Sequence, residues 1–185
     1  MTNSKIPTDF NPGCFLGSFF DVAKAVLLTP KVFFSTMDRR SAFVNPFIFL
    51  VSCVAAHTFL AGLLHRVPGP GLFLQNLFMG ITIPFLTAGI FFLILTRVFN
   101  SPGTYKATFR INAYAAAVGL VTWIPVAGIF LELYRLYILV VGLRAVYAIK
   151  ASRAVITIFL TLIAYTVMFR VLSDLTGGQF IKLPG

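Results

Sequence analysis

Residues 67–96 read VPGPGLFLQNLFMGITIPFLTAGIFFLILT, a run of 30 residues that contains no Asp, Glu, Lys or Arg. About 20 apolar residues in an α-helix cross the roughly 30 Å hydrocarbon core of a bilayer. A charged side chain at the bilayer centre costs roughly 2.5–3.5 kcal/mol, so long uncharged runs are typical of spanning helices. This stretch therefore predicts a transmembrane helix, and it sets the fold class of the chain.

Four more apolar regions accompany this run, at residues 41–65, 111–131, 128–149 and 154–169. One of them carries three charged residues, Glu132, Arg135 and Arg144. Pro, Gly and Asn residues separate the regions and place five helices at about residues 45–64, 72–98, 105–123, 129–149 and 152–172. We therefore expect an all-α integral membrane protein with a bundle of five transmembrane helices.

The composition excludes several other classes of protein. The chain is 58% hydrophobic and 11% charged, whereas soluble domains carry about 25% charged residues. A soluble domain of this composition would expose large apolar patches to water. Disordered, collagen-like and disulfide-scaffold classes are excluded as well.

The first 40 residues form a separate amphipathic segment. Phe19, Val22 and Val26 follow helical spacing, and Thr29-Pro30 opens a second short helix. Neither helix is long enough to span a bilayer. We expect both to lie in the headgroup plane, with packing on the cytosolic end of the bundle as the alternative. The chain then divides into a cytoplasmic segment and a five-helix transmembrane domain, at residues 1–40 and 41–185.

The net charge of +10 indicates an orientation rather than a nucleic-acid partner. Eleven of the 15 Lys and Arg residues fall on one side of the predicted bundle. They lie in the N-terminal segment and in the second-to-third and fourth-to-fifth connections. The positive-inside rule places that side and the N-terminus in the cytoplasm, and the C-terminus outside or in a lumen.

Two charges inside the fourth predicted helix mark the first candidate site. Glu132 and Arg135 are three residues apart, so they share a helix face and can pair within one turn. An ionisable residue inside a membrane is a functional-site hypothesis by default. The pair is either a structural ion pair near the outer interface or a ligand or ion site. Tyr114 and Arg144 complete this candidate intramembrane polar site.

A collar of basic residues on the cytoplasmic side is the second candidate site. Each Lys or Arg near an anionic membrane surface contributes about 1 kcal/mol of attraction. The collar either binds anionic lipid headgroups or only fixes the topology. Its members are Arg39, Arg40, Lys106, Arg110, Lys150 and Arg153.

Two further patterns predict contacts between helices. Every fourth residue of the last helix is polar, a stripe that should face other helices: Arg153, Thr157, Thr161 and Tyr165. In the third helix, small residues that permit close backbone approach recur at the same spacing, at Ala113 and Ala117 and at Ala115 and Gly119.

No pattern in the chain indicates catalysis. A nucleophile elbow, a phosphate loop, a zinc-protease pair and a dinucleotide fingerprint are all absent, and five acidic residues leave little for acid–base chemistry. Cys14 and Cys53 form no Cys-x-x-Cys pair, and His57 is expected to be a hydrogen-bonded packing residue. We expect a protein that is not an enzyme and holds no cofactor or metal.

Landmark residues along the chain resemble those of a known family. They are Thr29-Pro30-x-x-Phe33-Phe34-x-x-Met37, Ile124-Pro125-x-x-Gly128, Leu133-Tyr134-x-Leu136-Tyr137, Val141-Gly142-Leu143-Arg144-Ala145 and Ser152-Arg153-Ala154. Over residues 25–172 the chain resembles the Yip1 domain family. The resemblance implies five spans and a cytosolic N-terminus. Eukaryotic members act in early secretory trafficking and associate with Rab GTPases or shape membranes.

The chain departs from the eukaryotic members in two ways. Its segment ahead of the bundle is only about 40 residues long, and that segment has no Asp-Leu-Tyr-Gly-Pro motif. Both departures argue against Rab binding and favour a compact, bacterial-type member. The expected location is then a bacterial inner (plasma) membrane, with the Golgi or ER membrane as the alternative for a eukaryotic chain.

Two functions remain open at this point. The first is a non-enzymatic scaffold that organises membrane partners or lipids through its N-terminal segment and basic face. The alternative is a small-solute transporter or lipid-translocating protein whose site includes Glu132, Arg135 and the second helix, which Pro84 should bend. The expected partners are membrane lipids, and either another membrane protein or a second copy of the chain.

Overall fold

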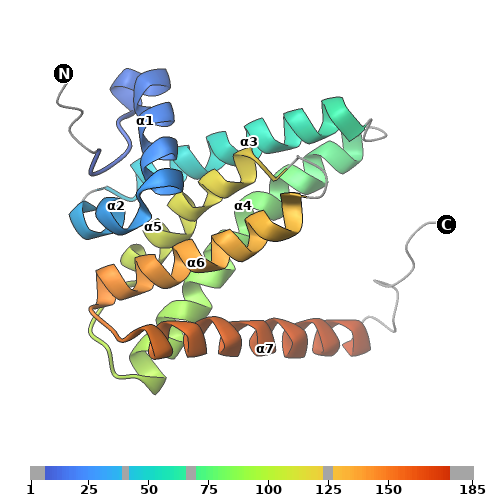
Figure 1. The fold of residues 1–185 in the computed structure, drawn as a ribbon. Coiled ribbons are helices and arrows are strands. Elements are labelled where there is room, and N and C mark those ends of the chain that lie inside the picture. Colours follow the sequence, from blue (N-terminus) through green and yellow to red (C-terminus); the bar gives the residue numbers. More distant parts are fainter. Residues whose placement is uncertain (1–6, 39–41, 66–69, 123–126, 176–185) are drawn as a thin grey trace.

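The computed structural model describes residues 7–38, 42–65, 70–122 and 127–175, and within these ranges the chain is helical with no strand. The long helices are α3 (Val44–His65), α4 (Pro70–Leu93), α6 (Ala127–Tyr147) and α7 (Ala151–Leu175) (Figure 1). Between them lies the shorter α5 (Tyr105–Ala115). The N-terminal part holds the short η1 (Pro12–Cys14) followed by α1 (Phe15–Leu28) and α2 (Pro30–Thr36).

Two helices change their winding before they end. A π-helical turn, η2 (Ile94–Val98), extends α4, and a 3-10 helix, η3 (Ala116–Leu120), extends α5. With these extensions, each of the five helices expected from the sequence is present and begins and ends within a few residues of its predicted bounds. Pro84 lies inside α4, which continues through it as one helix.

Three helices are long and apolar enough to cross a membrane: α3, α4 with η2, and α7. The bent pair formed by α1 and α2, which meet at 117°, makes a fourth candidate if it counts as one broken span. The predicted count of five spans is therefore not confirmed. The helix α5 has only 11 residues, and α6 carries Glu132, Arg135 and Arg144 within its 21 residues.

The centre of the molecule is α5 with its extension η3. It packs against α1, α3, α4 and α6, and every residue from Ala107 to Val118 is buried. Ala113, Ala115 and Ala117 have no exposed surface, so three of the four small residues predicted to mediate helix contacts are buried. The fourth, Gly119, has open space where a Cβ would stand and is not at a close helix contact. A helix surrounded in this way needs no apolar exterior, so it tolerates Arg110, Asn112 and Tyr114 in its sequence.

The N-terminal helices pack on the bundle. Phe19, Val22 and Val26 of α1 are buried beside α5 and η3, while Phe33 and Phe34 of α2 are buried beside α6. The expectation that these apolar faces lie in the headgroup plane is therefore wrong, and the alternative of packing on the bundle is the observed one. The opposite face of α1 is apolar as well and stays exposed, at Leu16, Phe20 and Leu28.

The last helix, α7, lies at one side of the molecule, where it packs on α4, η2 and α6 (Figure 1). Its polar stripe faces other helices, as predicted, because Thr157 and Thr161 are buried and the Tyr165 hydroxyl lies 2.7 Å from Thr87 Oγ1 of α4. A true reversal separates α7 from α6, since Ala148 has a left-handed φ of 53°.

Candidate functional site

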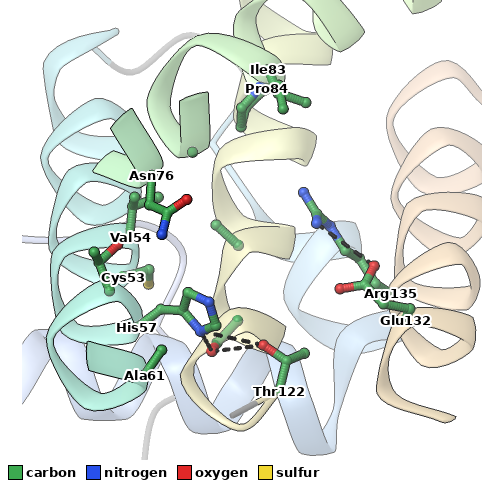
Figure 2. A pocket seen from close by; sticks show the side chains of 14 residues that line it. Cys53, Val54, His57, Ala61, Asn76, Ile83, Pro84, Thr122, Glu132 and Arg135 are labelled. Atoms are coloured by element: carbon green, nitrogen blue, oxygen red, sulfur yellow. Dashed lines mark hydrogen bonds and ion pairs between the residues drawn. The ribbon is translucent and has the colours of Figure 1, made fainter. Parts of the chain in front are cut away.

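A cavity of about 320 Å³ lies between α3, α4, the end of η3 and α6 (Figure 2). The helix α3 contributes five lining residues and α4 contributes four, while α6 contributes its two charged ones. The lining residues are Cys53, Val54, His57, Thr58, Ala61, Asn76, Gly80, Ile83, Pro84, Ala116, Gly119, Thr122, Glu132 and Arg135. The lining is therefore mixed, with apolar side chains and several polar groups.

One wall of the cavity carries the Glu132–Arg135 pair (Figure 2). Nη1 of Arg135 lies 3.8 Å from Oε2 of Glu132, which confirms that the two side chains meet within one turn. The Arg135 side chain is 33% exposed and the Glu132 side chain is 58% exposed. A pair this long and this open contributes little to stability, so both charges retain hydrogen-bonding capacity for another molecule.

The opposite wall carries His57. Its Nδ1 lies 2.8 Å from the carbonyl oxygen of Gly119, which Thr122 Oγ1 also contacts at 3.1 Å. A carbonyl oxygen only accepts hydrogen bonds, so Nδ1 must donate, and the neutral ring then presents Nε2 as an acceptor. Among the described residues Nε2 has no partner, which leaves that acceptor available to a ligand.

The α4 wall combines close packing with a freed carbonyl. A Cβ added to Gly80 would stand 2.5 Å from Val54 Cγ1, so this glycine allows α3 and α4 to approach closely. Pro84 has no N–H, so the carbonyl of Gly80 lacks the donor that a helix normally supplies four residues later. Both residues line the cavity together with Glu132 and Arg135.

A second polar cluster ties the N-terminal segment to the bundle. The guanidinium of Arg110 is fully buried, with Nη2 2.9 Å from Oδ1 of Asp9 and Nη1 donating to the carbonyl of Ala42 at 3.2 Å. The hydroxyl of Tyr114 donates to the same carboxylate, and Asn45 donates to it at 3.4 Å. This cluster joins three parts of the chain far apart in sequence.

The four residues expected to form one intramembrane polar site do not come together. Glu132 and Arg135 line the cavity, whereas Tyr114 belongs to the Asp9 cluster. Arg144 lies on α6 beside a separate pocket of about 350 Å³, which it shares with Lys31 of α2. The remaining lining of that pocket is apolar: Val141, Ala145, Ala148 and Ile149.

The predicted basic collar is only partly at the surface. Arg110 was expected to contact anionic lipid, but it is fully buried because Asp9 supplies its counter-charge. Lys150 and Arg153 are exposed near the α6–α7 reversal, and the Arg153 guanidinium lies 5.8 Å from the centre of the Phe99 ring. Lys106 is half-buried, and Arg39 and Arg40 lie outside the described residues.

The sequence did not predict that Asp9 pairs with Arg110, and it did not predict that His57 lines a cavity. Nothing near Asp9 in the sequence marks it as the partner of a residue 101 positions later. His57 was expected to be a packing residue, and its Nδ1 does make such a hydrogen bond, yet its ring lines the cavity. No group of three His, Cys, Asp or Glu side chains that could hold a metal occurs in the described ranges.

Comparison with known proteins gives one match. A sequence model described as the Yip1 domain matches residues 24–171, which is most of the chain and includes every residue that lines the cavity. Neither the curated proteins nor the solved structures contain a significant match.

Proposed function

Because the chain belongs to the Yip1 domain family, we propose that it is a non-enzymatic membrane scaffold that organises lipids and holds a lipid headgroup in the cavity between α3, α4 and α6. The chain is a membrane protein with several apolar helices long enough to span. The Yip1 domain family is not in general a family of enzymes.

The observation that carries the proposal is a polar cavity surrounded by lipid-facing surface. The three helices that line the cavity also expose large apolar side chains: Phe59, Leu63, Leu74, Phe78, Ile129, Phe130 and Leu133. An amphiphile matches both features, because its headgroup would occupy the polar cavity while its chains lie along these side chains. A purely polar solute would match the cavity alone.

The charge distribution suggests which leaflet the lipid would come from. The cavity extends from the middle of α3 and α4 toward the C-terminal end of α3 and the N-terminal ends of α4 and α6. The positive-inside rule assigns those ends to the outer or lumenal side, opposite Lys31, Lys150 and Arg153. The proposed headgroup site therefore opens to the outer leaflet.

Filling the cavity tests the proposal. We expect Ala61→Phe, which adds a ring to the cavity wall, to abolish lipid retention when the purified protein is examined by native mass spectrometry. Ala55→Phe is the matched control, because it is half-buried on the same helix but does not line the cavity. Equal lipid retention in both folded variants would contradict the proposal.

Transport is the second candidate, and one observation favours it. Pro84 and the Glu132–Arg135 pair line the same cavity, and proline-containing helices beside polar groups are typical of transporter binding sites. A small-solute transporter or lipid-translocating protein would move its ligand across reconstituted vesicles. Lipid retention without flux of labelled lipid or of a solute panel would leave the scaffold as the function.

The scaffold also needs a partner surface, and α7 offers one. Only 12% of the most apolar stretch of α7 is buried. The helix exposes large apolar side chains along much of its length. We propose that a membrane-protein partner or a second copy of the chain packs there. Crosslinking in native membranes distinguishes the two partners by mass.

A further inference from the structure

We infer that the cavity between α3, α4 and α6 selects a zwitterionic headgroup in which a primary ammonium stands next to a phosphodiester, as in phosphoethanolamine. The inference rests on the proposed lipid-binding function and adds the chemical class of the ligand. It follows from three features of the cavity: its paired charges, its set of hydrogen-bond acceptors and its size.

The paired charges call for a ligand that carries both signs. The planar guanidinium of Arg135 matches a phosphate, and the carboxylate of Glu132 accepts hydrogen bonds from an ammonium. Since these two side chains are 3.8 Å apart and partly exposed, a headgroup with adjacent opposite charges would replace one loose contact by two charge-assisted ones. An anionic headgroup without an ammonium would pair its phosphate with Arg135 but leave the Glu132 carboxylate without a cation.

The acceptors distinguish a primary ammonium from a quaternary one. A primary ammonium has three N–H donors and needs acceptors for them, whereas a trimethylated ammonium has none. Besides Glu132, the cavity wall offers Nε2 of His57, whose Nδ1 donates to the carbonyl of Gly119, and the side-chain amide oxygen of Asn76. Figure 2 shows His57 and Asn76 across the cavity from the Glu132–Arg135 pair, so the acceptors surround the space rather than cluster on one side.

The size of the cavity agrees with a headgroup. Its volume of about 320 Å³ falls at the low end of ligand pockets, which usually measure roughly 300–1,000 Å³. Such a space accommodates a phosphoethanolamine group and part of a glycerol, while acyl chains would have to remain outside. The helices α4 and α6, which line the cavity, also expose apolar side chains such as Phe78 and Phe130, against which acyl chains can pack.

A competition experiment tests the inference. The full-length protein in detergent is incubated with lipids of identical acyl chains that carry phosphoethanolamine, phosphocholine or phosphoglycerol headgroups, and bound lipid is quantified by native mass spectrometry. We expect the phosphoethanolamine lipid to be favoured about tenfold over each of the others, the size of effect that one charge-assisted hydrogen bond gives.

Single neutralising variants assign the two charges. We expect Glu132→Gln to lose the preference for phosphoethanolamine while still retaining lipid, and Arg135→Gln to lower the retention of all three lipids. Asp21→Asn, an exposed acid on α1 outside the cavity, is the control and should leave both properties unchanged. Thermal unfolding of each variant verifies that it is folded, and Glu132→Asp should restore part of the preference.

The outcomes separate the inference from the function beneath it. Lipid retention that Ala61→Phe abolishes, but without headgroup preference or without an effect of Glu132→Gln, overturns the zwitterion inference and leaves the proposed function standing. Retention that Ala61→Phe does not change overturns the proposed function itself. A final arm adds water-soluble glycerophosphoethanolamine. Displacement of the lipid at equal concentration would assign the site to the free headgroup compound instead of a membrane lipid.

Discussion

Arg110 has a different environment in the structure from the one that the sequence predicts. In the sequence it is one of several cations spaced along a helix, and in the structure it is a fully buried guanidinium held by Asp9. Two charges removed from water stabilise a fold only when each compensates the other. The pair therefore holds the N-terminal segment in place, whereas either charge left without the other would destabilise the fold.

Removal of Asp9 should strongly destabilise the protein. Asp9→Ala leaves the Arg110 charge buried without a partner, and we expect a loss of about 3–5 kcal/mol in the free energy of unfolding. Denaturant titration of the purified protein in detergent measures this loss. Asp21→Asn, at an exposed acid, should change stability by less than about 0.5 kcal/mol.

A double variant shows whether the cost comes from the unpaired charge. Asp9→Leu with Arg110→Met removes both ions, and its loss should be clearly smaller than that of Asp9→Ala. An equal loss in the two variants would mean that the polar contacts of Tyr114 and Asn45, rather than the buried charge, hold the segment.

At the scale of helices, the sequence predicted position well and environment poorly. Runs of apolar residues and Pro-Gly punctuation are local signals, so the bounds of α3, α4 and α7 agree with expectation within a few residues. The environment of α1 depends on what packs against it, and an amphipathic face looks the same whether lipid or protein covers it. That is why the headgroup-plane expectation failed.

Helix caps also show that local sequence patterns do not predict contacts with residues distant in the sequence. Asn45 precedes Pro46, a pattern typical of a helix N-terminus, yet α3 already begins at Val44 and the Asn45 side chain donates to Asp9. Thr104, by contrast, caps α5 by accepting from the backbone N–H of Ala107 at 3.3 Å. A distant carboxylate competes with the local cap, and no local rule anticipates it.

The contact between α3 and α4 depends on a glycine. Gly80→Ala places a methyl group 2.5 Å from Val54 Cγ1, and Val54 is β-branched and cannot move away easily. We expect a loss of about 1–3 kcal/mol in unfolding free energy, as is typical of overpacking. Adding Val54→Ala should recover part of it, and a double-mutant cycle by thermal unfolding measures the coupling. Additive losses would contradict direct contact.

At the scale of the whole molecule, the basic residues predict an orientation. We expect Lys150→Cys to react with a membrane-impermeant maleimide only from the cytoplasmic side and Asp174→Cys only from the opposite side, since α7 lies between them. The background is Cys14→Ala, because Cys14 is exposed and Cys53 is buried. Labelling of both positions from one side would show that α7 does not span.

The sequence by itself determined that this chain is a helical membrane protein, where its long helices lie and that Glu132 pairs with Arg135. These features depend on hydrophobic runs and on spacings within one or two turns, which the chain displays locally. Only the tertiary structure decided that Asp9 neutralises Arg110, that α1 and α2 pack on the bundle, and that His57, Pro84 and the Glu132–Arg135 pair share one cavity. Such contacts join residues tens of positions apart in the sequence. They form, and stabilise the protein, only when the helices are packed together.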